Sequence, residues 1–148
     1  AKQHQLILNL LKLLRVHFLN GLLKTMKRHI VAYKIFDVVV VPFPFTDQDT
    51  DKRRPALVLS DHARFNDETQ NCVMAMITSA KNPDWPLDAK IGGIKKAGLP
   101  APSKVRMKLF TLDSRLIVKK IGGLAVKDQK IVKKNLKKLM NLETEEEL

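Results

Sequence analysis

Cysteine is nearly absent from this chain, since Cys72 is the only one among 148 residues. A single thiol cannot form an intrachain disulfide, and it excludes a metal site built from several cysteines. The low cysteine content suits a reducing compartment, so we expect a cytoplasmic protein. Because Cys72 lies in an apolar run, we interpret it as a buried core thiol rather than a nucleophile.

Histidine is also scarce, and three of the four histidines fall within the first 30 residues, which leaves His62 alone in the rest of the chain. No HExxH, CxxC or histidine–carboxylate spacing occurs, so the sequence predicts no metal centre and no other cofactor. A ribonuclease mechanism with two histidines is excluded as well. The two Gly-Gly pairs lack the other residues of a phosphate-binding loop, so we interpret them as turns.

Long apolar runs and acidic residues near the start are missing too. No apolar stretch reaches the roughly 20 residues that span a bilayer, so we expect no membrane partner. The first 30 residues hold six Lys and Arg and no acid, which leaves +6 of the net charge of +12 for the remainder. A basic globular body favours an anionic partner, most often a nucleic acid.

Residues 1–30 differ in composition from everything that follows, and we treat them as a separate segment from a domain at 31–148. Leucines at near-helical spacing, with basic residues between them, predict an amphipathic helix over 5–28. Three interpretations remain open for it: a membrane-surface or import helix, a helix that docks on the domain or on a second subunit, or an extension outside the functional protein. Under the third interpretation Met26 is the natural start.

After residue 30 the apolar pattern changes to that of short strands and one last helix. Strands are predicted over five segments: 36–41, 55–60, 72–78, 104–112 and 115–121. In the fourth, Val105 and Met107 are expected on one face and Arg106 on the other. A C-terminal helix is predicted with Asp128 as its N-cap and an apolar stripe of Val132, Leu136, Leu139 and Met140. This order indicates a mainly β domain, a small and strongly bent antiparallel sheet or barrel.

Two polar groups stand at strand ends. Lys52, Arg53 and Arg54 end a charged loop and lead into the second strand, and Thr78 and Ser79 end the third. If these strands pair as neighbours, the polar ends can share a face, and an arginine fork there suits phosphate recognition. The alternative is a solvated basic turn and an ordinary turn closed by a hydroxyl.

A series of short segments then resembles the MazF/PemK family of toxins. The series consists of DVVVVPFPFTD at 37–47, KRRPALVLS at 52–60, FN at 65–66, ITS at 77–79, AGLP at 97–100, PS at 102–103 and IGGL at 121–124. Their order and spacing match the family from about Lys34 to about Met140. Two features depart from it: Phe36 stands where the family usually has glycine, and residues 1–25 have no counterpart.

The resemblance implies an SH3-like small antiparallel barrel with a C-terminal helix, here with an extra N-terminal amphipathic helix. It also implies a homodimeric toxin of a toxin–antitoxin pair, with a cognate antitoxin and single-stranded RNA as partners. Such toxins cut RNA without metal and leave a 2′,3′-cyclic phosphate and a 5′-hydroxyl. By position, Arg54 and Thr78 match the catalytic residues of the family.

Other residues are candidates for RNA contacts. Lys52 and Arg53 are expected to contact phosphates, Asp49 lies in the loop where some members carry an acid, and Ser79 neighbours Thr78. Trp85 is a candidate for stacking on a base. Phe43, Phe45 and Phe65 could also stack on bases. Packing is nevertheless the favoured role of Phe43 and Phe45, because they flank prolines next to a core strand. The alternative function is a non-catalytic toxin on the same fold that inhibits a protein such as DNA gyrase.

Overall fold

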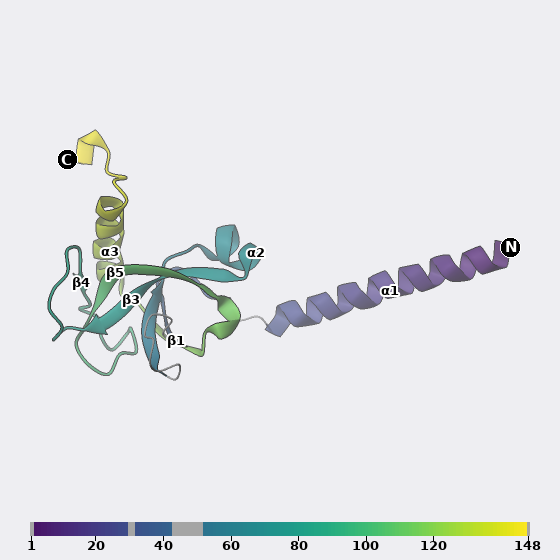
Figure 1. The fold of residues 1–148 in the computed structure, drawn as a ribbon, viewed down its shortest axis with the longest axis horizontal. Helices are drawn as coiled ribbons and strands as arrows, with labels where there is room; N and C mark the ends of the chain where they lie inside the picture. Colours follow the sequence, from purple (N-terminus) through teal and green to yellow (C-terminus); the bar gives the residue numbers. More distant parts are fainter. Residues whose placement is uncertain (1, 30–31, 43–51, 148) are drawn as a thin grey trace. The chain divides into compact units, whose positions relative to one another are not determined.

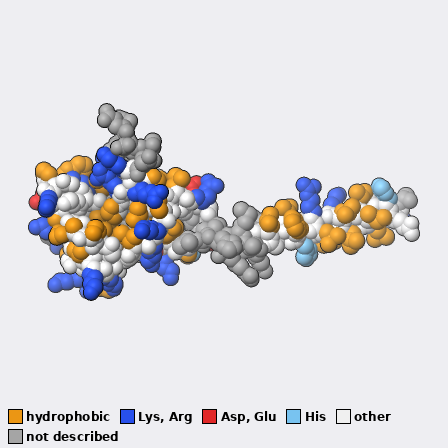
Figure 2. Space-filling view, turned by 90° about the horizontal axis from the view of Figure 1, so that it is seen from below, with side chains coloured by type: hydrophobic (Ala, Val, Ile, Leu, Met, Phe, Trp, Pro, Cys, Tyr) orange, Lys and Arg blue, Asp and Glu red, His pale blue; other side chains and the backbone are white. Residues whose placement is uncertain are grey.

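The computed structural model describes residues 2–29, 32–42 and 52–147. The chain divides into two compact units, Ala1–Ala32 and Tyr33–Leu148, and each is described by itself. The first unit is helix α1 (Lys2–His29), which confirms the predicted N-terminal helix. All large apolar side chains between residues 6 and 22 are exposed, as the apolar atoms along α1 in Figure 2 show. No helix within the described residues is long and apolar enough to cross a membrane.

The second unit is built from short strands with one long helix (Figure 1). Its strands are β1 (Asp37–Pro42), β2 (Arg53–Val58), β3 (Asn71–Ser79), β4 (Ala89–Lys90), β5 (Ser103–Asp113) and β6 (Lys119–Gly123). Its helices are α2 (Asp67–Thr69) and α3 (Val126–Leu139), and short helical turns are η1 (His62–Asn66), η2 (Ser114–Leu116) and η3 (Glu145–Glu147). The predicted mainly β domain with a C-terminal helix is therefore confirmed.

The strands form one curled antiparallel sheet. Across the described residues the order is β4-β5-β3-β2-β1-β6, so consecutive strands β1, β2 and β3 lie side by side. The pairs Val38–Leu57 and Leu57–Ala75 fix the register of these three strands. The predicted small, bent antiparallel barrel is confirmed as an open half-barrel of this kind.

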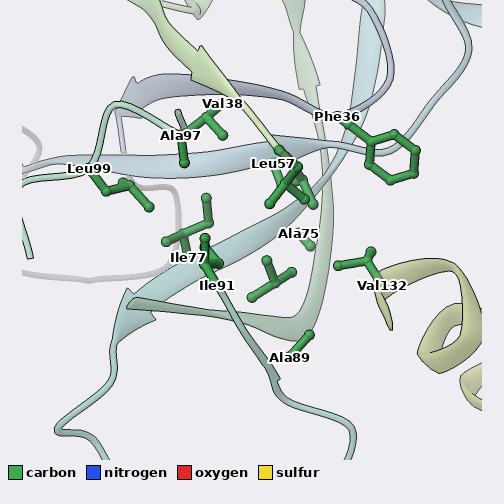
Figure 3. Packing of buried hydrophobic residues seen from close by; sticks show 12 residues of the cluster. Phe36, Val38, Leu57, Ala75, Ile77, Ala89, Ile91, Ala97, Leu99 and Val132 are labelled. Carbon is green, nitrogen blue, oxygen red and sulfur yellow. The ribbon is translucent and has the colours of Figure 1, made fainter. Parts of the chain in front are cut away.

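One face of the sheet packs on α3 and forms the central core. Val38, Leu57 and Ala75 from three neighbouring strands are fully buried there, and Val132 projects from α3 into the same cluster (Figure 3). The opposite face carries a second core that includes Val58, Met74 and Cys72. Cys72 has no exposed surface, as expected of a core thiol. Because side chains alternate along a strand, burial on both faces explains why the first strand is a continuous run of valines.

Two glycine-containing segments from the family series cross in close contact. A Cβ at Gly122 would lie 2.4 Å from the carbonyl carbon of Ala97, and one at Gly98 would lie 2.0 Å from the carbonyl oxygen of Ile121. The Gly123 amide donates to the Lys96 carbonyl over 3.1 Å. Glycine is needed here because any side chain would separate the two backbones. Gly122 and Gly123 thus lie within β6, whereas the sequence predicted that they end a strand.

Phe36 adopts a backbone conformation that favours glycine. Its φ is 69°, in the left-handed region where a Cβ is strained. The ring is buried in the central core, and the Lys133 ammonium lies 5.4 Å from its centroid. The burial of a large aromatic ring offsets the backbone strain, which explains how phenylalanine occupies a position where the family usually has glycine.

The predicted fifth strand and the predicted helix N-cap need correction. The strand predicted over 115–121 begins only at Lys119, because Asp113 accepts hydrogen bonds from the backbone and guanidinium of Arg115 and starts the turn η2. Asp128 is not the N-cap of α3, which begins at Val126. Its carboxylate instead accepts the amides of Gly92 and Gly93 at 3.0 and 2.9 Å.

The apolar stripe predicted on α3 is half right. Val132 is buried and Leu136 packs against the central core. Leu139 and Met140, at the C-terminal end of the helix, are exposed. The stripe therefore covers the sheet only over the first part of the helix.

Candidate functional site

Arg54 and Thr78 lie at the same end of neighbouring strands. The recorded pairing of β2 with β3 ends at Ala56 and Met76, and each of the two residues lies two positions beyond that pair in the same direction. The strand pairing continues through both residues, since Arg54 stands opposite Val41 in β1 and Thr78 opposite Lys104 in β5. Residues two apart in one strand share a face, so Arg54 lies on the face of Ala56 and Thr78 on the face of Met76. Ala56 and Met76 are cross-strand partners on the face that carries the second core, so Arg54 and Thr78 share that face.

The two side chains differ in their environment. Arg54 is half-buried. Thr78 is buried, and its Oγ1 accepts a hydrogen bond from the side-chain Nδ2 of Asn82 over 2.6 Å. The predicted pairing of the second and third strands as neighbours is thus confirmed, and it brings the polar ends of both strands to one place.

The remaining predicted residues are spread around this strand end. Lys52 and Arg53 are exposed, and Arg53 begins β2 instead of ending a loop. Ser79 is exposed, and its hydroxyl oxygen accepts from the Lys81 amide over 3.3 Å, so it closes a turn. Asp49 lies outside the described residues, together with Phe43 and Phe45. Phe65 is half-buried in η1.

A group of charged side chains lies beside Thr78, and the sequence analysis did not single it out. One of them, Asp84, is exposed, and the other three are largely buried. We call Asp84, Asp88, Lys104 and Arg106 the ion cluster. The Lys104 side chain is 0% exposed, and its Nζ lies 2.7 Å from Asp84 and 3.6 Å from Asp88. The Arg106 guanidinium donates to both carboxylate oxygens of Asp88 at 3.2 and 2.8 Å. Two cations and two anions therefore face each other on the face of β5 that Thr78 shares.

The charges balance, and the hydrogen bonds set the pKa values of the acids. The hydrogen bond from Lys104 and its positive charge lower the pKa of Asp84. Burial raises the pKa of Asp88, but hydrogen bonds from Arg106 and from the Trp85 amide outweigh it and lower the pKa overall. The hydrogen bond with Asp88 raises the pKa of Arg106. Asp84, Asp88 and Arg106 are therefore charged at neutral pH.

Trp85 belongs to the same segment. Its indole is 48% exposed, and the Arg106 guanidinium lies 4.6 Å from the ring centroid. The stacking partner that the structure gives Trp85 is thus a cation of the ion cluster. The predicted contact of Trp85 with a base remains a prediction.

The second unit carries many basic side chains. Figure 2 shows Lys and Arg side chains spread over the visible face of the second unit, with few acidic ones among them. Within the described ranges, no three His, Cys, Asp or Glu side chains gather closely enough to hold a metal ion. Every buried side-chain nitrogen or oxygen that the structure describes has a hydrogen-bond partner.

Comparison with protein families shows which family this chain belongs to. Residues 34–140 match the family described as PemK-like, MazF-like toxin of type II toxin-antitoxin system. The chain belongs to this family. The match covers well over half of the chain and has the limits that the sequence resemblance predicts. No curated protein matches the sequence.

Solved structures share the fold. A mycobacterial endoribonuclease in complex with its cognate antitoxin superposes with a TM-score of 0.62 at 18% identity, covering 76% of this chain and 99% of that one. MazF from Deinococcus radiodurans superposes at 0.60 with 23% identity, covering 75% and 98%. The Mycobacterium tuberculosis toxin MazF-mt6 gives 0.59 at 18% identity, covering 73% and 99%. At these identities the likeness establishes the fold.

Proposed function

We propose that this toxin is an endoribonuclease that cleaves single-stranded RNA without a metal ion, with Arg54 and Thr78 as its catalytic residues. One observation carries the proposal: the two residues lie at the same end and on the same face of neighbouring strands. They come from separate segments of the family series, and pairing of those segments brings them together. The cognate antitoxin and a homodimeric, cytoplasmic form are part of the same proposal.

The chemistry assigns different tasks to the two side chains. The ribose 2′-oxygen attacks the adjacent phosphorus, the bond to the 5′-oxygen breaks, and a 2′,3′-cyclic phosphate and a 5′-hydroxyl result. Negative charge grows on the nonbridging oxygens of the pentacoordinate phosphorus. The Arg54 guanidinium can donate two parallel hydrogen bonds to these oxygens, which stabilises the transition state. The Thr78 hydroxyl can donate a further hydrogen bond to them or to the 2′-oxygen.

The neighbouring residues fit binding of the RNA backbone. Lys52 and Arg53 are exposed beside Arg54 and are proposed to contact flanking phosphates. Asp49, Ser79 and Trp85 keep their proposed contacts with the RNA. RNA held with its 2′-oxygen in line with the leaving oxygen gains part of the rate from orientation alone.

The test is cleavage of a single-stranded RNA by the full chain in excess EDTA. We expect discrete fragments with cyclic phosphate ends. Arg54→Ala should lower turnover by roughly 10²–10³-fold, and Arg54→Lys should restore little because the fork is lost. Thr78→Ala should be similarly weak, while Thr78→Ser should keep part of the activity.

Arg64→Ala is the matched control, because it removes an exposed arginine from η1 and should cleave like the wild type. Wild-type cleavage by Arg54→Ala would falsify the assignment of the site. A requirement for added Mg²⁺ would contradict the metal-free mechanism. Toxicity without any RNA cleavage would favour the alternative, a toxin that inhibits a protein target.

We further propose that the domain at 31–148 carries the activity by itself and that residues 1–30 are a separate segment. A chain of residues 26–148 is expected to cleave RNA at least as well as the full chain, with an unchanged oligomeric state. Size-exclusion chromatography and cleavage assays compare the two. An unfolded or inactive shorter chain would mean that α1 is integral to the protein.

A further inference from the structure

The segment between β3 and β4 covers the face of the sheet on which Thr78 lies. Its backbone turns back on β3. The backbone N–H of Asn82 donates to the Ser79 carbonyl over 3.1 Å, and the backbone N–H of Ala80 donates to the Pro102 carbonyl over 3.0 Å. This places Asn82 over Thr78 and Asp84 over Lys104. The position of Asn82 is therefore set by a turn attached to two strands.

Lys104 is the anchor beneath this segment. Thr78 and Lys104 are direct partners across β3 and β5, so their side chains share one face. The Lys104 Nζ donates to the Asn82 carbonyl and lies 2.7 Å from an Asp84 oxygen. A fully buried ammonium is costly without such partners. Lys104 thus binds the segment at two points, one of them the backbone of Asn82 itself.

The contact of Asn82 with Thr78 determines how the hydroxyl can act. The Asn82 Nδ2 donates to Thr78 Oγ1 over 2.6 Å, which occupies an acceptor position of the hydroxyl. A hydroxyl carries one proton and two acceptor positions. With an amide donor on the oxygen, the single proton is directed away from Asn82 and is left for another acceptor.

We propose that Asn82 is a positioning residue for Thr78: anchored by Lys104, it fixes the rotamer of the threonine and directs its hydroxyl proton toward the substrate phosphate. The inference rests on the proposed function, because it assigns Thr78 a hydrogen bond to the reacting phosphodiester. A fixed donor requires no reorientation when charge develops, which is the condition for effective stabilisation of a transition state.

The experiment measures kcat and KM of the full chain on a single-stranded RNA. Asn82→Ala should lower kcat by roughly 10–100-fold, the range expected when a catalytic group is misplaced, with KM changed less than about twofold because the residue does not hold the RNA. Asn82→Asp should lose at least as much kcat, since a carboxylate only accepts and turns the threonine proton toward itself. Asp84→Asn should fall between Asn82→Ala and the wild type.

Two controls separate positioning from a structural effect. Lys81→Ala changes an exposed side chain in the same turn and should leave kcat and thermal stability as in the wild type. The double variant Asn82→Ala/Thr78→Ala should be no slower than Thr78→Ala alone, because Asn82 acts only through Thr78.

The outcomes distinguish this inference from the proposed function. Wild-type kcat in Asn82→Ala or Asn82→Asp, with Thr78→Ala inactive, overturns the inference and leaves the proposed function standing. Additive losses in the double variant, or a loss confined to KM, overturn it as well. Absence of cleavage by the wild type, or full activity of Thr78→Ala, overturns both.

Discussion

The central core and the ion cluster, of which only Asp84 is exposed, lie against the same strands, but different forces hold them. The core consists of apolar side chains such as Leu57 and Ile77, which gain free energy simply by leaving water. The ion cluster consists of charges that lose hydration and regain it only through specific hydrogen bonds. Ile77 and Thr78 are adjacent in β3, and each points into one of these regions.

The difference teaches how one strand contributes both to the core and to the candidate site. A buried ion pair is weak evidence for stability, because its attraction is spent largely on desolvation. It is strong evidence for fixed geometry, because charged hydrogen bonds are directional. The core therefore accounts for the fold, and the ion cluster accounts for the exact placement of the segment over Thr78.

The largest expected effect is on the ion cluster. Asp88→Ala leaves Lys104 and Arg106 without their shared partner and should destabilise the fold by about 3–5 kcal/mol. Urea unfolding measures the change, and Glu68→Ala, an exposed acid in α2, should stay within about 0.5 kcal/mol of the wild type. Replacing Asp88 and Arg106 together by leucine should recover much of the loss. A double variant as unstable as the sum of its single variants would contradict this account.

The pH dependence of the stability that Asp88 provides follows from its pKa. In the folded chain the pKa of Asp88 lies below the ordinary value of 3.8. Its contribution to stability is therefore fully present above pH 3.8 and is lost as the pH falls through the lowered folded value. The stability difference between the wild type and Asp88→Ala should shrink at pH 3 or below. Urea unfolding over this acid range is the measurement, and a difference that does not change would contradict it.

The second effect concerns Phe36 in the central core. Phe36→Ala keeps the strained backbone and loses the buried ring, at a cost of about 3–5 kcal/mol. Phe36→Gly loses the ring but relieves about 1–2 kcal/mol of left-handed strain. We therefore expect the glycine variant to be the more stable of the two, which reverses the usual order. Thermal unfolding of both variants decides this, and a less stable glycine variant would show that the strain is not present.

A smaller effect separates the two regions at adjacent positions. Ile77→Val removes one methylene from the central core and should cost about 0.5–1.5 kcal/mol. The kcat for RNA should not change, because the side chain points away from Thr78. Thr78→Ser is the comparison, and it should reduce kcat more than stability. A fall in kcat for Ile77→Val would mean that the core itself positions the site.

The smallest effect is chemical. Burial raises the pKa of the Cys72 thiol, and thiolate is the form that reacts with disulfide reagents. The native chain at pH 8 should react slowly with such a reagent and rapidly once urea unfolds it. Fast reaction of the native chain would indicate that the second core opens readily.

The fold was predictable from the sequence wherever the signal is local. The valine run that ends at Pro42 and the apolar segment at 72–78 gave correct strands, because continuous apolar runs and proline act over a few residues. The ends of the strands were predicted less accurately. The arginine at position 53 lies in β2, since pairing with β1 extends the strand into residues that look like loop. The turn η2 was missed because it depends on the hydrogen bonds that Asp113, directly before it, accepts from Arg115.

The site was predictable in part. Arg54 and Thr78 are candidates from strand-end position and family resemblance, and the register places them on one face. The ion cluster was missed because Lys104 and Asp84 are 20 residues apart and nothing in their local pattern pairs them. Alternation along β5 correctly separated Arg106 from Val105, but it carried no information on what covers that face.

The sequence by itself determined most of the strands, because apolar runs and turn residues act through neighbouring positions. The order and spacing of its short segments determined the family. Only the tertiary structure decided that Lys104 and Arg106 are buried, that Asp128 binds the amides of Gly92 and Gly93, and that Asn82 lies on Thr78. These contacts arise when the connection between β3 and β5 folds back over the sheet. Apart from Asn82 and Thr78, which are four residues apart, the partners are distant in the chain. A buried polar group without a hydrogen bond is costly, so each of these groups has a partner.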